Sequence, residues 1–167
     1  MHVAWYACGL RGICDGRSVA ELGTFMVRVD DGGEYLVMSD DADLDSLHEA
    51  DLPDYRGIVA GTGVAVIRIL GGEETEFVEV EVAAFDEPPD PSELQAMYAA
   101  WADVDSSQLR TNGPLELRSV EQEPIVTVAP PRRHWVAVCR NPAPEDRIER
   151  HKLIVFPDPM EWLRSRV

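Results

Sequence analysis

The sequence has few cysteines, a single lysine and no long apolar run, and these shortages exclude several classes of protein. The three cysteines, Cys8, Cys14 and Cys139, are an odd number, which argues against a disulfide framework and predicts reduced thiols. The first residues lack a basic region followed by an apolar one, and no apolar run approaches the ~18 residues of a membrane-spanning helix. We therefore expect a cytoplasmic protein. One lysine, Lys152, among many arginines is typical of a bacterial genome rich in G and C.

Recognisable catalytic motifs are also missing. The chain contains no glycine-rich dinucleotide or phosphate loop, no Gly-x-Ser-x-Gly and no His-Glu-x-x-His. With 31 acidic residues, no carboxylate pair stands out as an acid–base couple. The length of 167 residues is about that of one domain. We expect a single domain over residues 1–167 that is not an enzyme and needs no cofactor.

What the chain has in excess is negative charge, and the excess is confined to its middle. The net charge is −16. Residues 30–105 hold 21 acids and only two bases, Arg56 and Arg68, whereas residues 1–29 and 106–167 are each slightly positive. Such a field repels nucleic acids and anionic membranes and attracts basic partners. A surface that serves only solubility is the alternative interpretation.

Alternating apolar residues predict two consecutive β-hairpins. The strands of the first are expected at residues 24–29 and 34–38, and those of the second at 58–70 and 75–85. In the last of these, Val78, Val80 and Val82 share one face, as in a half-buried antiparallel strand. The stretch from Gly61 to Gly63 predicts a bulge or a close approach of another backbone segment.

Helices are expected to be few and short. One is predicted over residues 91–102, where Leu94, Met97, Tyr98 and Trp101 form one apolar face. Others are expected at 39–54 and 160–163, a loop at 9–17, and further strands at 2–8, 115–120, 125–129, 134–140 and 151–156. The predicted fold class is mainly β (α+β): an antiparallel β-sandwich or partly closed barrel with two or three short helices.

One acidic stretch has the outline of a calcium loop and lacks its essential residues. Asp41, Asp43 and Asp45 have the spacing of calcium ligands. Ser46 stands where the loop needs glycine, and Leu52 where it needs glutamate. A solvated acidic loop is therefore expected.

The cysteines predict neither a zinc site nor a nucleophile. Cys8 and Cys14 are separated by more than the two to four residues usual in structural zinc sites. Cys139 and His134 are an odd number of residues apart on one expected strand, so they point to opposite faces. That arrangement argues against a catalytic pair of Cys139 and His134. His151 is the other histidine that could act with Cys139. We expect no metal.

A basic and aromatic stretch runs through Arg132, Arg133, His134 and Trp135. Such a stretch is typical of a contact with an anionic partner or with nucleic acid. The interpretation we favour is a loop whose positive charge balances the acidic middle.

The second half of the chain has a recognisable order of elements. A proline-rich acidic linker precedes Trp101, a Gly-Pro-Leu-Glu-Leu strand at 113–117, the stretch 125–131, and a strand that closes on Phe156 and Pro157. From residue 78 to residue 157 this order resembles the β-sandwich proteins related to the competence nuclease inhibitor and similar bacterial immunity proteins. Arg132 stands where those proteins have glycine, and Phe156 where they have tryptophan. The resemblance implies a non-enzymatic sandwich that inhibits a toxin or nuclease.

We interpret the chain as an acidic immunity or inhibitor protein that caps a basic target, a toxin or nuclease, and binds neither nucleic acid nor membranes. Electrostatic steering would speed the capture of such a target. The alternatives are a small-ligand or metal-dependent enzyme with its site in the loop from Cys8 to Asp15, and a structural subunit of a phage or bacterial assembly. The expected partner contacts are Asp40, Asp41, Asp43, Asp45, Asp51 and Asp54.

Overall fold

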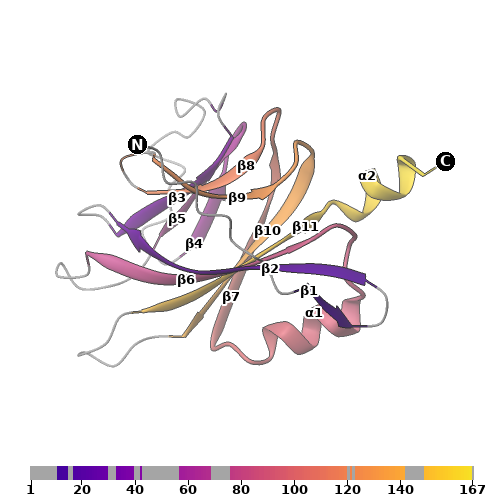
Figure 1. Ribbon diagram of the computed structural model, residues 1–167, viewed down its shortest axis with the longest axis horizontal. Coiled ribbons are helices and arrows are strands. Elements are labelled where there is room, and N and C mark those ends of the chain that lie inside the picture. The colour runs from indigo at the N-terminus through magenta and orange to yellow at the C-terminus, as the bar shows by residue number, and fades with distance from the viewer. Residues whose placement is uncertain are drawn as a thin grey trace.

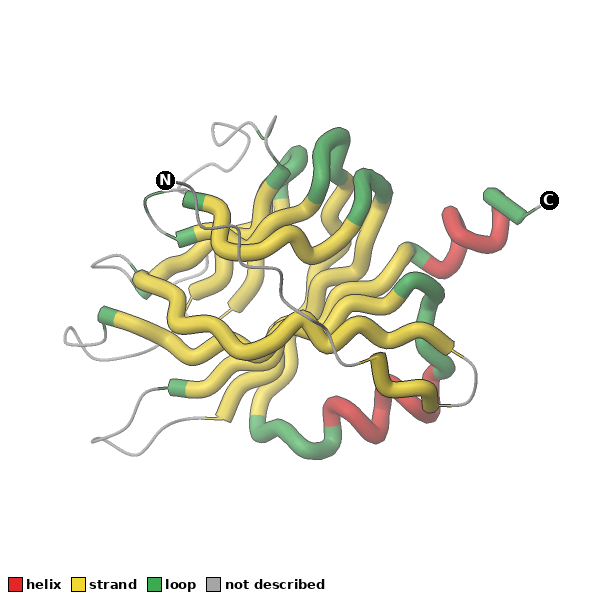
Figure 2. Tube along the Cα trace, in the orientation of Figure 1, coloured by secondary structure: helices red, strands yellow, loops and turns green. Residues whose placement is uncertain are grey.

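The computed structural model describes residues 11–14, 17–29, 33–39, 42, 57–68, 76–119, 121, 123–141 and 149–166. For residues 11–14 and 17–20, Leu36 and Met38 it describes the backbone alone. The strand expected at 2–8 and nearly all of the helix expected at 39–54 lie outside these residues. The described residues form strands in two sheets and two short helices (Figures 1 and 2), which confirms the predicted mainly β class.

The strands are divided between two sheets with interleaved chain order. Sheet A runs in the order β1 (Arg11–Cys14), β2 (Arg17–Arg28), β6 (Phe77–Phe85), β11 (Arg150–Pro157), β10 (Arg133–Asn141), β7 (Asp103–Arg110). Sheet B runs in the order β4 (Gly57–Ala60), β5 (Val64–Arg68), β3 (Glu34–Met38), β8 (Leu115–Arg118), β9 (Pro124–Ala129). Neighbouring strands are antiparallel, except that β6 and β11 run parallel.

The main core lies between the two sheets, and the valines of β6 show how it is built. Val78, Val80 and Val82 are fully buried, as predicted, whereas Phe77 on the opposite face is 40% exposed. Val27 of sheet A and Tyr35 of sheet B enter the same core. A period of two thus gives each strand one face inside the sandwich.

A second, smaller core lies on the outer face of sheet A. This is the face against which α1 (Pro91–Tyr98) lies (Figure 2). Leu94, Met97, Tyr98 and Trp101, the predicted apolar face, pack there against buried residues of the sheet that include Cys139. The helix is shorter than predicted and ends at Tyr98. Trp101 follows in a turn, where its N–H donates to the Tyr98 carbonyl at 3.0 Å.

The first predicted hairpin is wrong, although both of its strands exist. β2 pairs with β6 in sheet A, and β3 pairs with β5 and β8 in sheet B. The chain therefore crosses between sheets where a hairpin was expected. A connection that passes to the other sheet and a hairpin within one sheet bury the same alternating apolar residues of the two strands. The alternation of apolar and polar residues therefore did not distinguish the two topologies.

The second predicted hairpin is wrong for a related reason. Where one strand was expected at residues 58–70, the structure has two, β4 and β5, which pair with each other. β6, within the expected strand 75–85, belongs to the other sheet. The reversal falls at Gly61–Gly63, where Gly63 has a φ of +71°. A Cβ at Gly63 would lie 2.9 Å from Ser39 Oγ. The Ser39 N–H also donates to the Gly63 carbonyl at 2.8 Å, so the predicted close approach of another backbone segment is confirmed, but in a turn.

Two strands lie where none was predicted. β7 has the polar sequence Asp-Val-Asp-Ser-Ser-Gln-Leu-Arg and forms an edge of sheet A. β1 occupies part of the expected loop at 9–17, where it pairs with β2, so the loop from Cys8 to Asp15 that was considered as an enzyme site is in part a strand. The predicted strands over β8 to β11 are present, and α2 (Pro159–Arg164) coincides with the predicted terminal helix. Neither helix of the described chain has the length and apolar character needed to cross a membrane.

At one corner the edges of the two sheets meet. The Ile58 N–H of β4 donates to Asp105 Oδ2 of β7 at 2.9 Å. The Gly63 N–H donates to the Arg110 carbonyl at 3.1 Å, and Thr62 forms a parallel bridge with Arg110. These contacts close the sandwich on one side and fix the end of β7.

Candidate functional site

Two arginines face each other on neighbouring strands at the end of sheet A. Arg110 on β7 lies directly opposite Arg133 on β10 in the antiparallel register. Alternation along β10 places Arg133 on the outer face with Trp135, whereas His134 points into the interior. Like charges directly opposite each other on adjacent strands are destabilising. The pair is therefore a position at which an added anion would be favourable.

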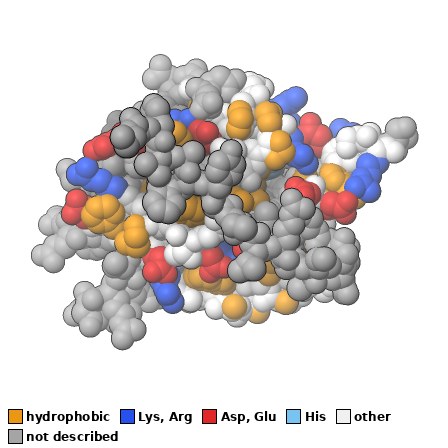
Figure 3. Space-filling view, in the orientation of Figure 1, with side chains coloured by type: hydrophobic (Ala, Val, Ile, Leu, Met, Phe, Trp, Pro, Cys, Tyr) orange, Lys and Arg blue, Asp and Glu red, His pale blue; other side chains and the backbone are white. Residues whose placement is uncertain are grey.

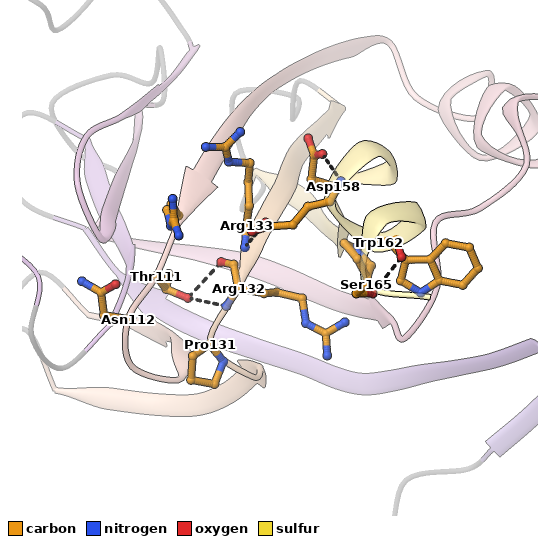
Figure 4. Close-up of a pocket in the computed structure, with 11 residues that line it drawn as sticks. Thr111, Asn112, Pro131, Arg132, Arg133, Asp158, Trp162 and Ser165 are labelled. Carbon is orange, nitrogen blue, oxygen red and sulfur yellow. Dashed lines mark hydrogen bonds between the residues drawn. The ribbon is translucent and has the colours of Figure 1, made fainter. Parts of the chain in front are cut away.

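These arginines line a pocket of about 610 Å³ between the end of sheet A and α2 (Figure 4). A smaller hollow of about 350 Å³ lies beside it and shares Arg110, Asn112 and Arg133 with it. The other residues of the larger pocket come from the segment after β7, the segment before β10, the last residue of β11, and α2 with its two caps: Thr111, Pro131, Arg132, Pro157, Asp158, Glu161, Trp162 and Ser165. This volume is within the range of sites that hold small ligands.

Both carboxylates of the pocket already accept hydrogen bonds. Asp158 caps α2: its Oδ1 accepts from the N–H groups of Met160 and Glu161 at 3.1 and 3.0 Å. Its Oδ2 accepts from Gln108 Nε2 at 2.9 Å. Glu161 Oε2 accepts from the backbone N–H of Arg133 at 3.2 Å. Within the described residues, neither carboxylate forms an ion pair with an arginine side chain of the pocket.

Hydrogen bonds fix the loop that presents Arg132. The N–H of Thr111 donates to the Arg132 carbonyl at 3.1 Å, and the Thr111 hydroxyl accepts from the Arg132 N–H at 3.4 Å. Beneath the loop, His134 Nε2 lies 2.9 Å from the Pro130 carbonyl oxygen, to which it donates. Burial lowers the pKa of His134 to about 4, so the ring is neutral at neutral pH. The backbone of the pocket wall is thus held by its own contacts.

The basic and aromatic stretch predicted at residues 132–135 does not form one surface. Arg132 and Arg133 line the pocket, but His134 is only 1% exposed and Trp135 packs into the outer core under α1. In the part of the chain that the structure describes, the side chains of Arg132 and Arg133 form no ion pair. The positive charge of this loop was expected to balance the acidic middle of the chain, and it does not do so by direct contact. Sequence reasoning missed Arg110, which only the strand register brings to this site.

A second polar cluster is buried between the sheets, at the opposite end of β10 and β11. The Tyr35 hydroxyl lies 2.9 Å from His151 Nδ1, and His151 Nε2 lies 3.4 Å from Glu149 Oε1. The fully buried Arg140 pairs with Asp103 at 3.2 Å. Burial raises the pKa of Tyr35 above its ordinary value, so its hydroxyl stays protonated. The cluster joins β3 of sheet B to β11 of sheet A, which is a structural role.

The six aspartates predicted as partner contacts lie outside the described residues: Asp40, Asp41, Asp43, Asp45, Asp51 and Asp54. Many acids of the middle that are described form ion pairs: Glu34–Arg68, Glu76–Arg28, Glu79–Arg150, Glu81–Lys152, Glu87–Arg166 and Asp103–Arg140. For Glu79 and Glu81 the cause is the sheet order, because β6 lies beside β11, which carries Arg150 and Lys152. On the face shown in Figure 3, acidic and basic side chains accordingly lie next to one another.

Cys139, the cysteine whose side chain the structure describes, is a core residue. Cys139 is fully buried on the α1 side of sheet A, where burial raises its pKa to about 11. His134 lies on the opposite face of the strand, as predicted. Among the described residues there is no group of three or more side chains that could hold a metal ion. Cys8 and the side chain of Cys14 lie outside them.

Comparisons with known proteins bear on the fold. No family model matches the sequence, and no curated protein matches it. The structure is similar to the crystal structure of ComJ, an inhibitor of the DNA-degrading activity of NucA, from Bacillus subtilis. The two match with a TM-score of 0.57 over 84% of this chain and 98% of ComJ, at 7% sequence identity. The chain therefore shares its overall fold with ComJ, and the likeness extends beyond the C-terminal half in which the order of elements was recognisable.

Proposed function

We propose that the protein is a non-enzymatic inhibitor that binds and blocks another protein, a nuclease or toxin with a basic surface. The observation that carries the proposal is the fold shared with ComJ, which covers 98% of that inhibitor. The net charge of −16 supports it, because a nuclease must attract phosphate and its cleft therefore tends to be basic. A protein that presents carboxylates occupies such a cleft in place of the substrate.

We place the main contacts on the six aspartates between residues 40 and 54. The strand acids Glu79 and Glu81 are compensated by Arg150 and Lys152, so they contribute little to the outward field. By contrast, residues 30–32, 40–41, 43–56 and 69–75 hold eleven of the 21 acids of the middle and one base. Negative charge concentrated there would steer a basic target toward the protein.

Affinity capture from a lysate of the organism that encodes the protein, followed by an activity assay of the captured protein, tests the proposal. The test variant replaces four of the predicted contacts: Asp41→Asn, Asp43→Asn, Asp45→Asn and Asp51→Asn. A matched control variant neutralises four acids at other exposed or half-exposed positions, so its net charge changes by the same amount. Its substitutions are Glu21→Gln, Asp86→Asn, Glu93→Gln and Glu123→Gln. Wild type and control are expected to retain a nuclease or toxin that the test variant loses.

The captured protein must also be inhibited. We expect its activity to fall when purified wild-type protein is added, and its association rate at low salt to drop by about tenfold or more with the test variant. Capture of a protein whose activity is unaffected would contradict the proposed inhibition. Equal association rates for the test variant and the control at low salt would contradict the role of the six aspartates.

A further inference from the structure

We infer that the arginine-lined pocket binds a carboxylate of the partner protein, with Arg110 and Arg133 as its ligands and Arg132 beside them. The inference rests on the proposed function in one respect, because the carboxylate is taken to belong to the protein that is inhibited. In the complex, the arginines of the pocket would then contact a negative group of the partner, whereas the six aspartates contact its positive surface.

The strand registers carry the inference. Charged residues that face each other on adjacent described strands are otherwise of opposite sign: Glu79 faces Arg150, Glu81 faces Lys152, Asp103 faces Arg140 and Glu34 faces Arg68. Each of these four pairs is also an ion pair. Arg110 and Arg133 are the pair of like charges in these registers, and no described carboxylate forms an ion pair with either. A carboxylate between them would turn a repulsive pair into an attractive group of three.

The charge of the pocket wall favours a carboxylate over a phosphate. Three arginines and two carboxylates line the pocket, and three positive minus two negative charges leave +1. One carboxylate neutralises this charge, whereas a phosphate dianion exceeds it in a protein whose net charge is −16. The planar fork of a guanidinium also fits a carboxylate with two parallel hydrogen bonds.

The size and the apolar part of the pocket favour a side chain within a peptide segment over a free ion. At about 610 Å³ the pocket is far larger than a carboxylate group needs. Pro131, Pro157 and Trp162 supply apolar wall for the carbon atoms next to the carboxylate. The adjoining hollow continues along Arg110 to Gly61 and Thr62, which gives an extended segment a path across the corner of the sandwich.

An NMR titration of the full-length protein tests the inference. The probe is a blocked hexapeptide with one central glutamate, compared with the same peptide carrying glutamine and with inorganic phosphate. We expect the glutamate peptide to shift the amide signals of Thr111, Asn112 and Arg133, and the glutamine peptide to leave them in place. Arg133→Gln and Arg110→Gln should each weaken binding by about tenfold or more, since each removes charge-assisted hydrogen bonds.

The control is Arg164→Gln, which removes an exposed arginine of α2 that does not line the pocket. It should change the affinity by less than about twofold, because a surface charge outside the site contributes little. Unchanged thermal unfolding of the two pocket variants shows that they remain folded. Absence of binding by the glutamate peptide, an equal response to the glutamine peptide, tighter binding of phosphate at the same residues, or wild-type affinity in Arg133→Gln would each overturn the inference.

Failure of this inference is distinguishable from failure of the proposed function. If Arg133→Gln inhibits the captured target as well as the wild type does, the pocket is not part of the inhibitory contact, and inhibition itself stands. If the pocket binds the glutamate peptide but no target is inhibited, the proposed function fails, and the carboxylate specificity of the pocket stands without a partner to supply it.

Discussion

Replacing Tyr35 by phenylalanine tests whether the buried polar cluster stabilises the contact between the two sheets. Tyr35 is fully buried in β3, and its hydroxyl lies 2.9 Å from Nδ1 of His151 in β11 of the other sheet. The two rings are tilted, with centroids 5.6 Å apart. Tyr35→Phe keeps the ring in the core and removes the oxygen that joins the sheets.

The expected magnitude follows from burial on both sides of this hydrogen bond. A typical internal hydrogen bond contributes about 1 kcal/mol to stability, but removal of one partner from a buried pair costs about 1–3 kcal/mol, because the other group regains no water. We expect the free energy of unfolding to fall by about 2 kcal/mol. In a domain of this length that loss lowers the Tm by about 4–8 °C.

Urea unfolding followed by tryptophan fluorescence measures the change, and Tyr98→Phe is the matched control. Tyr98 lies half-buried on α1, so the control removes the same oxygen from a position that water reaches. Its effect should stay within about 0.5 kcal/mol. Equal losses for the two variants would refute the reasoning, because the contact with His151 would then contribute nothing beyond the loss of a hydroxyl.

Three further predictions concern single residues. Gly63→Ala should lower the free energy of unfolding by about 1–2 kcal/mol, because a φ of +71° is unfavourable for alanine and its Cβ would lie 2.9 Å from Ser39 Oγ; a wild-type urea midpoint would contradict this. His134, with a pKa of about 4 when folded against 6.5 when unfolded, binds its proton first in the unfolded chain, so its contribution to stability is fully present above pH 6.5 and is lost as the pH falls toward 4. His134→Gln should therefore flatten this part of the pH profile of the urea midpoint, and parallel profiles would count against it. Cys139 should resist alkylation at about pH 8 until the protein unfolds, because burial raises the pKa of its thiol to about 11; modification of the folded protein, mapped to Cys139 by mass spectrometry, would contradict this.

Alternation along the sequence was sufficient to locate most strands and insufficient to pair them. Val78, Val80 and Val82 are buried as predicted, because a period of two is a property of one strand by itself. Pairing depends on which strand lies alongside. β2 and β3 are joined by a segment of hairpin length and yet belong to different sheets, so the local signal for a hairpin did not decide the topology.

The candidate site was the part least accessible from sequence. Arg132 and Arg133 were visible as a basic run, but Arg110 ends β7, an edge strand in which Leu109 is the one fully buried side chain. Edge strands tolerate polar residues because one side faces solvent, so their sequences are like those of loops. A sequence analysis that does not predict β7 cannot assign the register of β7 against β10, and that register is what places Arg110 opposite Arg133.

The charge pattern also acquires a different meaning in the folded chain. Exposed ion pairs such as Glu79–Arg150 add only about 0–1 kcal/mol each to stability. Their larger effect is on the outward field, because they neutralise the acids Glu79 and Glu81 of β6. The proposed function assigns the steering of a target to acids of residues 40–54 instead. In the described residues, Arg110 and Arg133 face each other and neither forms an ion pair with a carboxylate, although Asp158 and Glu161 line the same pocket. The proposed function and the inferred carboxylate site together call for a partner with a basic surface and an acidic side chain at set positions. A merely basic protein would meet repulsion at the pocket, so the two contacts together would discriminate between targets better than net charge does.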